Sequence, residues 1–447
     1  MPYPLSIQTL LLLSSLTLAA CQNKVYTLTG ASIQDPESCA ECHPLHYNQW
    51  SSSMHAYAGE DPVFLAMNRR GQRETNGELG AFCVSCHAPV ALRLGLTQNG
   101  LNLPELPAYT KGVTCYYCHS VVEVNGTHNN PLVLAQDEVL RGGILNPVET
   151  DAHASGYSTL LDGDDIKSAS MCGSCHDIVT PQGFHIERTY AEWKSTLYSD
   201  PDTQPALSCP ACHQSGTNGV IATGGNYPER RIHDHYFPGV DLALTPFPHA
   251  EQQREQVERA LNASLRTELC VYPDDERSYA VVTLENIGSG HSWPSGASAD
   301  RRAWVELEAS IDGEVFYTSG KVDHKTPITS ASDTWIIRDK LYNSEGHEVH
   351  MFWEAMDYTS NALPGPTALS PLNPDYVDTH VMRTYEVPGT LDKVRLQVHI
   401  RPIGLDILDD LIESGDLDPE FRDRMQTITI ESASLEWSVH NGVACIP

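Results

Sequence analysis

Positive charge is scarce in this sequence. Its 447 residues include 28 Lys and Arg against 58 Asp and Glu, which gives a formal net charge of −30. Nucleic acid and anionic membrane surfaces attract basic side chains, so this balance argues against either as a direct partner. We interpret the acidity as a solvated surface that keeps the protein soluble. The alternative is that the acidic surface steers a basic partner protein.

Long apolar runs are also scarce. The one long run, Leu5 to Ala20, is too short and too close to the start for a comfortable membrane span. It ends in Leu18-Ala-Ala-Cys21, which resembles a bacterial lipobox, although Met1 to Leu16 lack the Lys or Arg of a usual leader. We predict a signal peptide over residues 1–21 with lipidation at Cys21. An ordinary signal peptide, with Cys21 as a bystander, is the alternative.

Both interpretations export the chain to the periplasm or the cell surface. Residue Gln22 is not the Asp that holds well-studied lipoproteins in the inner membrane, so an outer-membrane lipid anchor is expected. The short polar segment 22–36 would then be a tether between the anchor and the folded part.

Cysteine is concentrated in one repeated pattern. Ten of the 13 Cys belong to five copies of Cys-x-x-Cys-His. The copies, numbered here as sites 1 to 5, are Cys39/Cys42/His43, Cys83/Cys86/His87, Cys115/Cys118/His119, Cys172/Cys175/His176 and Cys209/Cys212/His213.

This pattern is the attachment signature of c-type haem. Two cysteines three apart lie on one face of a helical turn, where both can form thioethers to one porphyrin, and the histidine becomes the proximal iron ligand. Zinc sites are the alternative, but they use Cys pairs two at a time, and five is odd. The sequence therefore predicts five covalently bound haem c groups, which is consistent with export because covalent attachment is completed outside the bacterial cytoplasm.

The remaining cysteines are Cys270 and Cys445, both beyond the last site. In an oxidising compartment this pair predicts a disulfide bond, which would stabilise the domain by a few kcal/mol. Two buried free thiols are the alternative.

Site 1 resembles the cytochrome c554 family of multihaem c-type cytochromes. It is followed by Trp50 and then Ser53-Met-His55, and in that family the downstream His ligates the iron of another haem. The resemblance implies the same role for His55. It also covers His153, and His235 in the stretch that ends at Gly239. The element Gly290-His291-Ser-Trp-Pro-Ser-Gly296 is similar to a loop in the β-domains of multihaem cytochromes whose His reaches back to a haem, with Ser295 in place of Thr. The family packs haems in near-parallel and near-perpendicular pairs.

Five irons need ten axial ligands, and five are the proximal histidines. From His46 to His291 the other histidines are His46, His55, His128, His153, His185, His233, His235, His249 and His291. We predict distal ligation by His55, His153, His185, His235 and His291, with His128 in reserve. Met54 or Met67 could replace one imidazole.

The fold class expected is multidomain. Residues 37–248 form a haem-packed, mostly α or irregular domain, because five porphyrins in so short a segment must supply much of the apolar interior. A connector helix follows over 249–269. Alternating apolar runs separated by turn residues predict an antiparallel β-sandwich over 270–447.

These expectations point first to an electron carrier, whose redox partners would be other cytochromes or a quinol-linked donor. One alternative is an oxidoreductase with one open iron that acts on a small nitrogen or sulfur compound. Tyr117, Arg231 and His233 would then move protons. The lack of a Cys-x-x-Cys-Lys copy departs from the pentahaem nitrite reductases. A second alternative is a subunit of an extracellular electron conduit.

Overall fold

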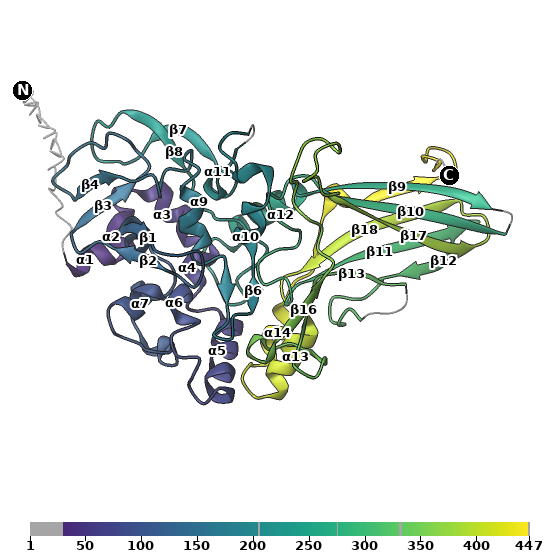
Figure 1. The fold of residues 1–447 in the computed structure, drawn as a ribbon, viewed down its shortest axis with the longest axis horizontal. Helices are drawn as coiled ribbons and strands as arrows, with labels where there is room; N and C mark the ends of the chain where they lie inside the picture. The colour runs from purple at the N-terminus through teal and green to yellow at the C-terminus, as the bar shows by residue number, and fades with distance from the viewer. Residues whose placement is uncertain (1–29, 204–205, 275, 330–332, 446–447) are drawn as a thin grey trace, which may run out of the picture.

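The computed structural model describes residues 30–203, 206–274, 276–329 and 333–445. It has two parts: a helical and irregular N-terminal half, and a β-rich C-terminal half built of antiparallel sheets (Figure 1). The chain is thus multidomain, and its fold class is the one that the sequence predicts. The predicted signal peptide and Cys21 lie outside the described residues.

The N-terminal half consists of short helices joined by loops and two-stranded ribbons. Its helices are α1 Ala31–Gln34, α2 Pro36–Ala40, α3 Pro44–Ser51, α4 Met54–Tyr57, α5 Pro62–Glu74, α6 Val84–His87, α7 Pro89–Arg93, α8 Cys115–His119, α9 Ser168–Gly173, α10 Thr189–Lys194 and α11 Cys209–His213. Its 3-10 turns are η1 Leu103–Glu105, η2 Ala108–Thr110 and η3 Leu197–Ser199.

Four ribbons complete this half, and the pair β3 and β4 is parallel whereas the others are antiparallel. The strands are β1 Val121–Val124, β2 Leu132–Leu134, β3 Val139–Gly142, β4 Ala154–Tyr157, β5 Ile178–Val179, β6 His185–Glu187, β7 Gly216–Val220 and β8 Glu229–His233.

The folded part begins earlier than the sequence predicts. Helix α1 and the first residue of α2 lie within the expected tether over 22–36, and Ile33 and Pro36 are buried. The apolar side chain of Ile33 and a helix start at Pro36, with Asp35 as its N-cap, explain why this stretch folds. Residues 31–36 of the expected tether therefore belong to the folded chain.

The connector is helix α12, Ala250–Asn262, which is shorter than the predicted 249–269. Strand β9, Leu265–Asp274, begins within that range, because from Leu265 the burial follows the two-residue period of a strand. The β-rich half therefore starts a few residues before 270.

Two sheets face each other in the β-rich half and enclose the largest buried apolar cluster of the described chain. One has the order β17-β10-β9, and the other has the order β12-β11-β18-β19 with β13 on β11 and β20 on β18. The strands of these sheets are β9, β10 Arg277–Asn286, β11 Arg302–Ile311, β12 Glu314–Ser319, β13 Trp335–Ile337, β17 His380–Pro388, β18 Lys393–Arg401, β19 Ile428–Thr429 and β20 Leu435–Ser438. This is an antiparallel sandwich.

A smaller antiparallel sheet and two helices lie at the end of the sandwich nearest the N-terminal half (Figure 1). These elements are β14 Asp339–Tyr342, β15 Glu348–Val349, η4 Phe352–Glu354, β16 Asp357–Ser360, α13 Leu405–Glu413, α14 Glu420–Arg424 and, between β19 and β20, η5 Glu431–Ala433. Helix α13 packs on α5 through an apolar cluster that includes Ala66 and Leu408. The Arg70–Asp410 ion pair, at 2.9 Å, borders this contact.

The described part of the N-terminal half has little side-chain core of its own. Its two buried apolar clusters are small, one around Phe64 and Val84 and the other around Val90 and Tyr117. Within the described residues, no helix is long and apolar enough to cross a lipid bilayer.

Candidate haem-binding centre

The five attachment motifs have the same local build. Each histidine follows a helical turn in which its backbone N–H donates to the carbonyl of the first cysteine, for example His43 to Cys39 at 2.8 Å and His176 to Cys172 at 3.0 Å. This turn sets the two thiols and the imidazole on neighbouring positions of one short helix. That arrangement suits one porphyrin held by two thioethers, with the histidine beneath its iron.

Each motif imidazole also has its Nδ1 hydrogen-bonded to an acceptor. The partners are carbonyls for four of them and a carboxylate for the fifth: Ile221 for His43 at 2.9 Å, Ala58 for His87 at 3.3 Å, Arg141 for His119, Pro238 for His213 at 2.8 Å, and Glu187 for His176 at 3.3 Å. A hydrogen-bonded Nδ1–H fixes the tautomer and leaves Nε2 as the metal ligand.

Four of the five motif imidazoles face a second imidazole at a nearly constant spacing. The ring centres are 6.2 Å apart for His43 and His153, 6.3 Å for His119 and His235, 6.1 Å for His176 and His55, and 6.4 Å for His213 and His291. An imidazole nitrogen lies about 2 Å from the metal it ligates, so two rings on opposite sides of one iron are about 6 Å apart. The residues therefore fit haem with two histidine ligands at these four sites.

The charge states of three of these rings suit ligation. Burial lowers the pKa of His55 to about 3 and, together with nearby His291, the pKa of His213 to about 4. Burial also places the pKa of His235 well below its ordinary value. These imidazoles are neutral at pH 7, which is the form that binds a metal.

Site 2 differs from the other four. The ring against His87 is Phe64, stacked with centres 4.1 Å apart and planes at 1°. Among the described residues, no second imidazole lies 6.1 to 6.4 Å from the His87 ring, the spacing found at the other sites. Four of the five predicted distal histidines, namely His55, His153, His235 and His291, therefore face a motif histidine, at sites 4, 1, 3 and 5, and none faces His87.

His185 does not face a motif histidine, which differs from the prediction. It lies on β6, whose pairing with β5 places it beside Asp177, at 3.6 Å between Nδ1 and Oδ1. Its neighbouring ring is His128, the reserve candidate, at 6.3 Å between ring centres.

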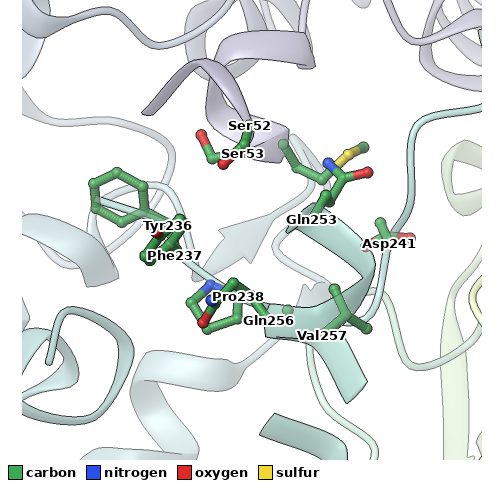
Figure 2. Close-up of a pocket in the computed structure, with 11 residues that line it drawn as sticks. Ser52, Ser53, Tyr236, Phe237, Pro238, Asp241, Gln253, Gln256 and Val257 are labelled. Carbon is green, nitrogen blue, oxygen red and sulfur yellow. The ribbon is translucent and has the colours of Figure 1, made fainter. Parts of the chain in front are cut away.

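The other histidines also have defined places. His46 packs edge-on against His235, with ring centres 4.9 Å apart, and its buried Nδ1 has no hydrogen-bond partner. His249 precedes α12 in a left-handed conformation. Of the two methionines considered, Met67 packs against the α5–α13 cluster, and Met54 lines the small pocket shown in Figure 2.

That pocket lies between Ser52 and Ser53, the Tyr236 to Pro238 segment and helix α12 (Figure 2). The ring of Phe237 contacts both His55, at 4.5 Å between centres, and His235, at 5.6 Å. Phe237 has a φ of 47°, a conformation that costs a bulky residue energy. Sequence reasoning assigned Phe237 no role between these two predicted distal ligands.

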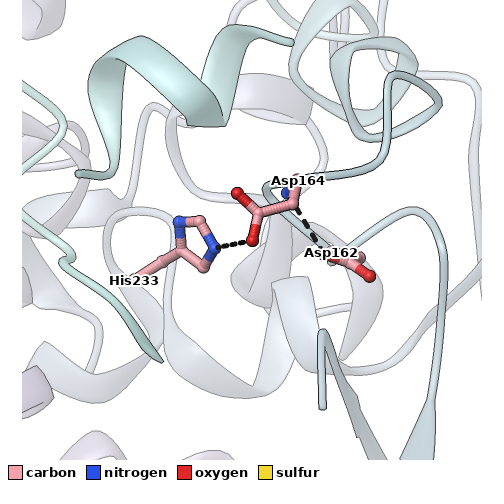
Figure 3. Close-up of side chains that lie close together, drawn as sticks. All are labelled: Asp162, Asp164 and His233. Carbon is pink, nitrogen blue, oxygen red and sulfur yellow. Dashed lines mark hydrogen bonds and ion pairs between the residues drawn. The ribbon is translucent and has the colours of Figure 1, made fainter. Parts of the chain in front are cut away.

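The three candidate proton donors are not gathered in one place. Tyr117 is buried and donates to Asn130 at 2.9 Å. Arg231 and His233 instead share Asp164, with Arg231 Nε at 2.6 Å and His233 Nε2 at 3.6 Å from the carboxylate (Figure 3 shows the His233 side). The structure therefore offers no single catalytic group that contains all three.

Thiols from different motifs lie close together. Cys39 is near enough to Cys115, Cys86 to Cys175, and Cys172 to Cys209 for each pair to shift one another's pKa. Because each thiol marks the edge of its own attachment site, this proximity places site 1 beside site 3, and site 4 beside both site 2 and site 5.

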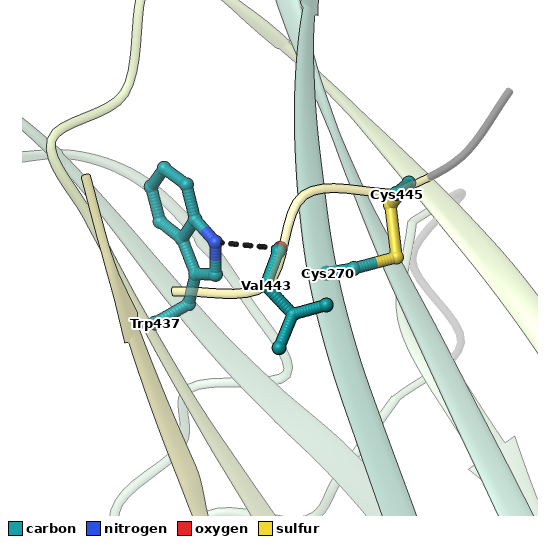
Figure 4. The surroundings of a disulfide bond; sticks show 4 residues. All are labelled: Cys270, Trp437, Val443 and Cys445. Carbon is teal, nitrogen blue, oxygen red and sulfur yellow. Dashed lines mark hydrogen bonds between the residues drawn. A yellow bond between two sulfur atoms is a disulfide. The ribbon is translucent and has the colours of Figure 1, made fainter. Parts of the chain in front are cut away.

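Cys270 and Cys445 form a disulfide bond (Figure 4). The bond joins β9 to the C-terminal segment, and the Val271 N–H donates to the Val443 carbonyl at 3.3 Å in the same place. Trp437 Nε1 donates to the same carbonyl at 2.9 Å. The first strand of the sandwich and the end of the chain are thereby fastened together.

Two comparisons with known proteins found matches. Residues 38–120, which contain sites 1 to 3, match the family described as cytochrome c554 and c-prime. The fold is similar to the crystal structure of a penta-heme cytochrome c552 from Thermochromatium tepidum, with a TM-score of 0.63 and 21% identity. That similarity covers 91% of this chain and 100% of the other. A search of curated proteins found no match.

Proposed function

We propose that this chain is a multihaem c-type cytochrome with covalently bound haem c, and that it is an exported pentahaem carrier that moves electrons by outer-sphere transfer. The observation that supports this best is the set of four facing imidazole pairs at 6.1 to 6.4 Å. Two protein ligands on an iron leave no coordination position for a substrate, which suits electron transfer and not bond-making.

The chain's own contacts suggest the order in which the sites communicate. The close thiol pairs connect site 1 to site 3 and connect site 4 to sites 2 and 5, and Cys118 of site 3 lies near Cys172 of site 4. We infer a path 1–3–4–5 with site 2 as a branch at site 4. Because the attachment turns of neighbouring sites are packed this closely, the haems they hold would have their edges within tunnelling distance.

A second candidate function is favoured by site 2. Among the described residues no second imidazole faces His87, whose ring is instead stacked on Phe64, so an iron at this site would keep one position open. Such a site could act on a small nitrogen or sulfur compound. The carboxylates of Glu187 and Asp241 act on the pKa of His87. Tyr117, Arg231 and His233 do not form one group.

Electron paramagnetic resonance of the oxidised holoprotein tests both proposals. We expect low-spin signals from the four imidazole pairs and one high-spin signal from site 2 that changes on addition of nitric oxide. His235→Ala should add a second high-spin signal at site 3, and His249→Ala, which changes a histidine outside the pairs, should add none. A wild-type spectrum with several high-spin irons would refute the four-pair assignment, and a fully low-spin spectrum would refute the open site.

We also propose that the protein is an outer-membrane lipoprotein that exchanges electrons with other cytochromes or a quinol-linked donor. Support comes from the lipobox-like sequence before Cys21 and from the disulfide, which suits an oxidising compartment. Labelled fatty acid should enter the wild-type chain and not Cys21→Ala. Equal labelling of both would refute the anchor.

A further inference from the structure

Two histidines expected at haems instead meet each other at the surface. His128 and His185 have ring centres 6.3 Å apart, which is within the range of the four haem-site pairs, although no attachment motif lies between them. The His185 side chain is half exposed, and His128 is exposed. This pair is therefore accessible from solvent and has no role in the proposed electron path.

The Nδ1 atoms of both rings already have partners. The Thr127 hydroxyl lies 3.1 Å from Nδ1 of His128, and the Asp177 carboxylate lies 3.6 Å from Nδ1 of His185. A metal-binding histidine characteristically has this outer-shell contact, which fixes the ring and leaves Nε2 for the metal. The Nε2 atom of each ring is thus left available to bind a metal.

Asp177 gives an independent indication. Its side chain is 5% exposed, and Oδ2 accepts a hydrogen bond from the Ala191 N–H at 2.9 Å. Its other oxygen, Oδ1, is fully buried without a hydrogen-bond partner and is the atom nearest to His185. A buried carboxylate oxygen that lacks a partner is costly unless a positively charged group compensates it.

The loop that carries His128 is held firmly in place. Asn129 exchanges two hydrogen bonds with the backbone of Val179, at 2.6 Å and 2.9 Å. The backbone N–H groups of Asn129 and Asn130 donate to Asp177 and Ser174. Because this loop is fastened to the same segment that leads into β6, the two histidines are presented as a fixed pair.

We propose that His128 and His185 bind a divalent transition metal through their Nε2 atoms, with Asp177 as the carboxylate that orients His185. The ring spacing is that of two imidazoles on opposite sides of one metal, which is compatible with the square-planar or octahedral preference of Cu²⁺ and Ni²⁺. Tetrahedral Zn²⁺ would need ring centres about 1 Å closer.

Two other clusters of ligand-type residues are less suitable. In the group of Asp162, Asp164 and His233, Arg231 already forms an ion pair with Asp164. His350 contacts Asp406 and Asp410, and Arg302 already neutralises Asp406. A cation at either place would have to displace an arginine.

Equilibrium dialysis of the holoprotein against Ni²⁺, with bound nickel measured by elemental analysis, tests the site. Ni²⁺ is used because the haems do not reduce it. We expect one equivalent of tightly bound nickel in the wild type and at least tenfold weaker binding in His128→Ala and His185→Ala. His347→Ala, which removes an exposed histidine outside the pair, should bind as the wild type does. Unchanged nickel binding in a variant that carries both His128→Ala and His185→Ala would overturn the proposal. Loss of nickel binding in His233→Ala would also overturn it.

Asp177→Asn separates an orienting role from a structural one. The amide keeps the shape of the side chain and should weaken nickel binding about tenfold, the effect expected on loss of an outer-shell carboxylate. The haem absorption spectrum should stay the same, which would show that the fold around site 4 is intact. Wild-type nickel affinity in a correctly folded Asp177→Asn protein would remove Asp177 from the site.

Discussion

At the scale of single residues, the most informative contact is the one between His176 and Glu187. The other four motif imidazoles donate to backbone carbonyls, whereas this one donates to a carboxylate at 3.3 Å. Burial lowers the pKa of His176, but the hydrogen bond and charge of Glu187, followed by the effects of Cys172 and Cys86, raise it to about 9. A more basic ligand and a nearby negative charge both favour ferric iron.

We therefore predict that Glu187→Gln raises the midpoint potential of one haem, the one at site 4, by tens of millivolts. Spectroelectrochemical titration measures this shift. The matched control is Glu314→Gln, which removes an exposed carboxylate from β12 in the sandwich and should leave every potential in place. A potential that falls, or one that stays unchanged, would contradict the role assigned to Glu187.

Asp300 provides a pH-dependent prediction. Burial raises its pKa to about 6, against the lowering effect of Arg302 and Arg301. The folded state then binds a proton more tightly than the unfolded state, so this group favours folding more as the pH falls from 7 towards 5. Relative to Asp300→Asn, the wild-type free energy of unfolding should rise by about 1 kcal/mol over that interval.

Denaturant unfolding followed by circular dichroism at pH 5 and pH 7 measures this difference. The Asp300→Asn variant is the reference for the wild type, because it cannot titrate at this position. A difference between the two proteins that does not vary with pH, or that shrinks as the pH falls, would contradict the account.

Residue-level sequence reasoning anticipated a large part of the candidate centre. His55, His153, His235 and His291 were expected as distal ligands, and each faces a motif histidine. The assignment failed for His185, because the pairing of β5 with β6 that turns it towards Asp177 is a tertiary contact. Spacing along the chain contains no sign of it. The same holds for Phe64, which occupies the place beside His87.

At the scale of elements, the N-terminal half repeats one device. Trp50 Nε1, on the helix after site 1, donates to the carbonyl of Val113, two residues before the first cysteine of site 3, at 2.8 Å. Trp193 Nε1, on the helix after site 4, donates to Leu207, two residues before the first cysteine of site 5, at 3.0 Å. These are the same site pairs whose thiols lie close together. Each Trp thus positions the attachment turn of a neighbouring haem.

Removing this hydrogen bond should loosen the pair it connects. Trp193→Phe keeps most of the aromatic surface but leaves the Leu207 carbonyl without its donor, which should lower the free energy of unfolding by about 1–3 kcal/mol. Trp353→Phe is the control, since its hydrogen bond to Glu74 is exposed and water can replace it. Denaturant titration of both variants checks the prediction, and equal losses in the two would contradict it.

At the scale of the whole molecule, the β-rich half takes part in the haem centre. The loop that carries His291 is fastened to α10, because Glu192 accepts hydrogen bonds from the Ser292 N–H at 3.2 Å and the Ser295 hydroxyl at 2.6 Å. The sandwich thereby supplies the imidazole opposite His213, so the two halves depend on each other. The family resemblance implied that this loop reaches back to a haem. The apolar contact of α13 with α5 could not be foreseen, since neither helix shows its partner in its own pattern.

The central claim is that thioether-bound haems at all five motifs form the interior of the N-terminal half. Mass spectrometry of the denatured, natively exported protein tests it most directly, because covalent haem survives denaturation and noncovalent haem does not. We predict a mass above that of the processed polypeptide by five haem groups. A polypeptide without added haem mass would contradict the whole account.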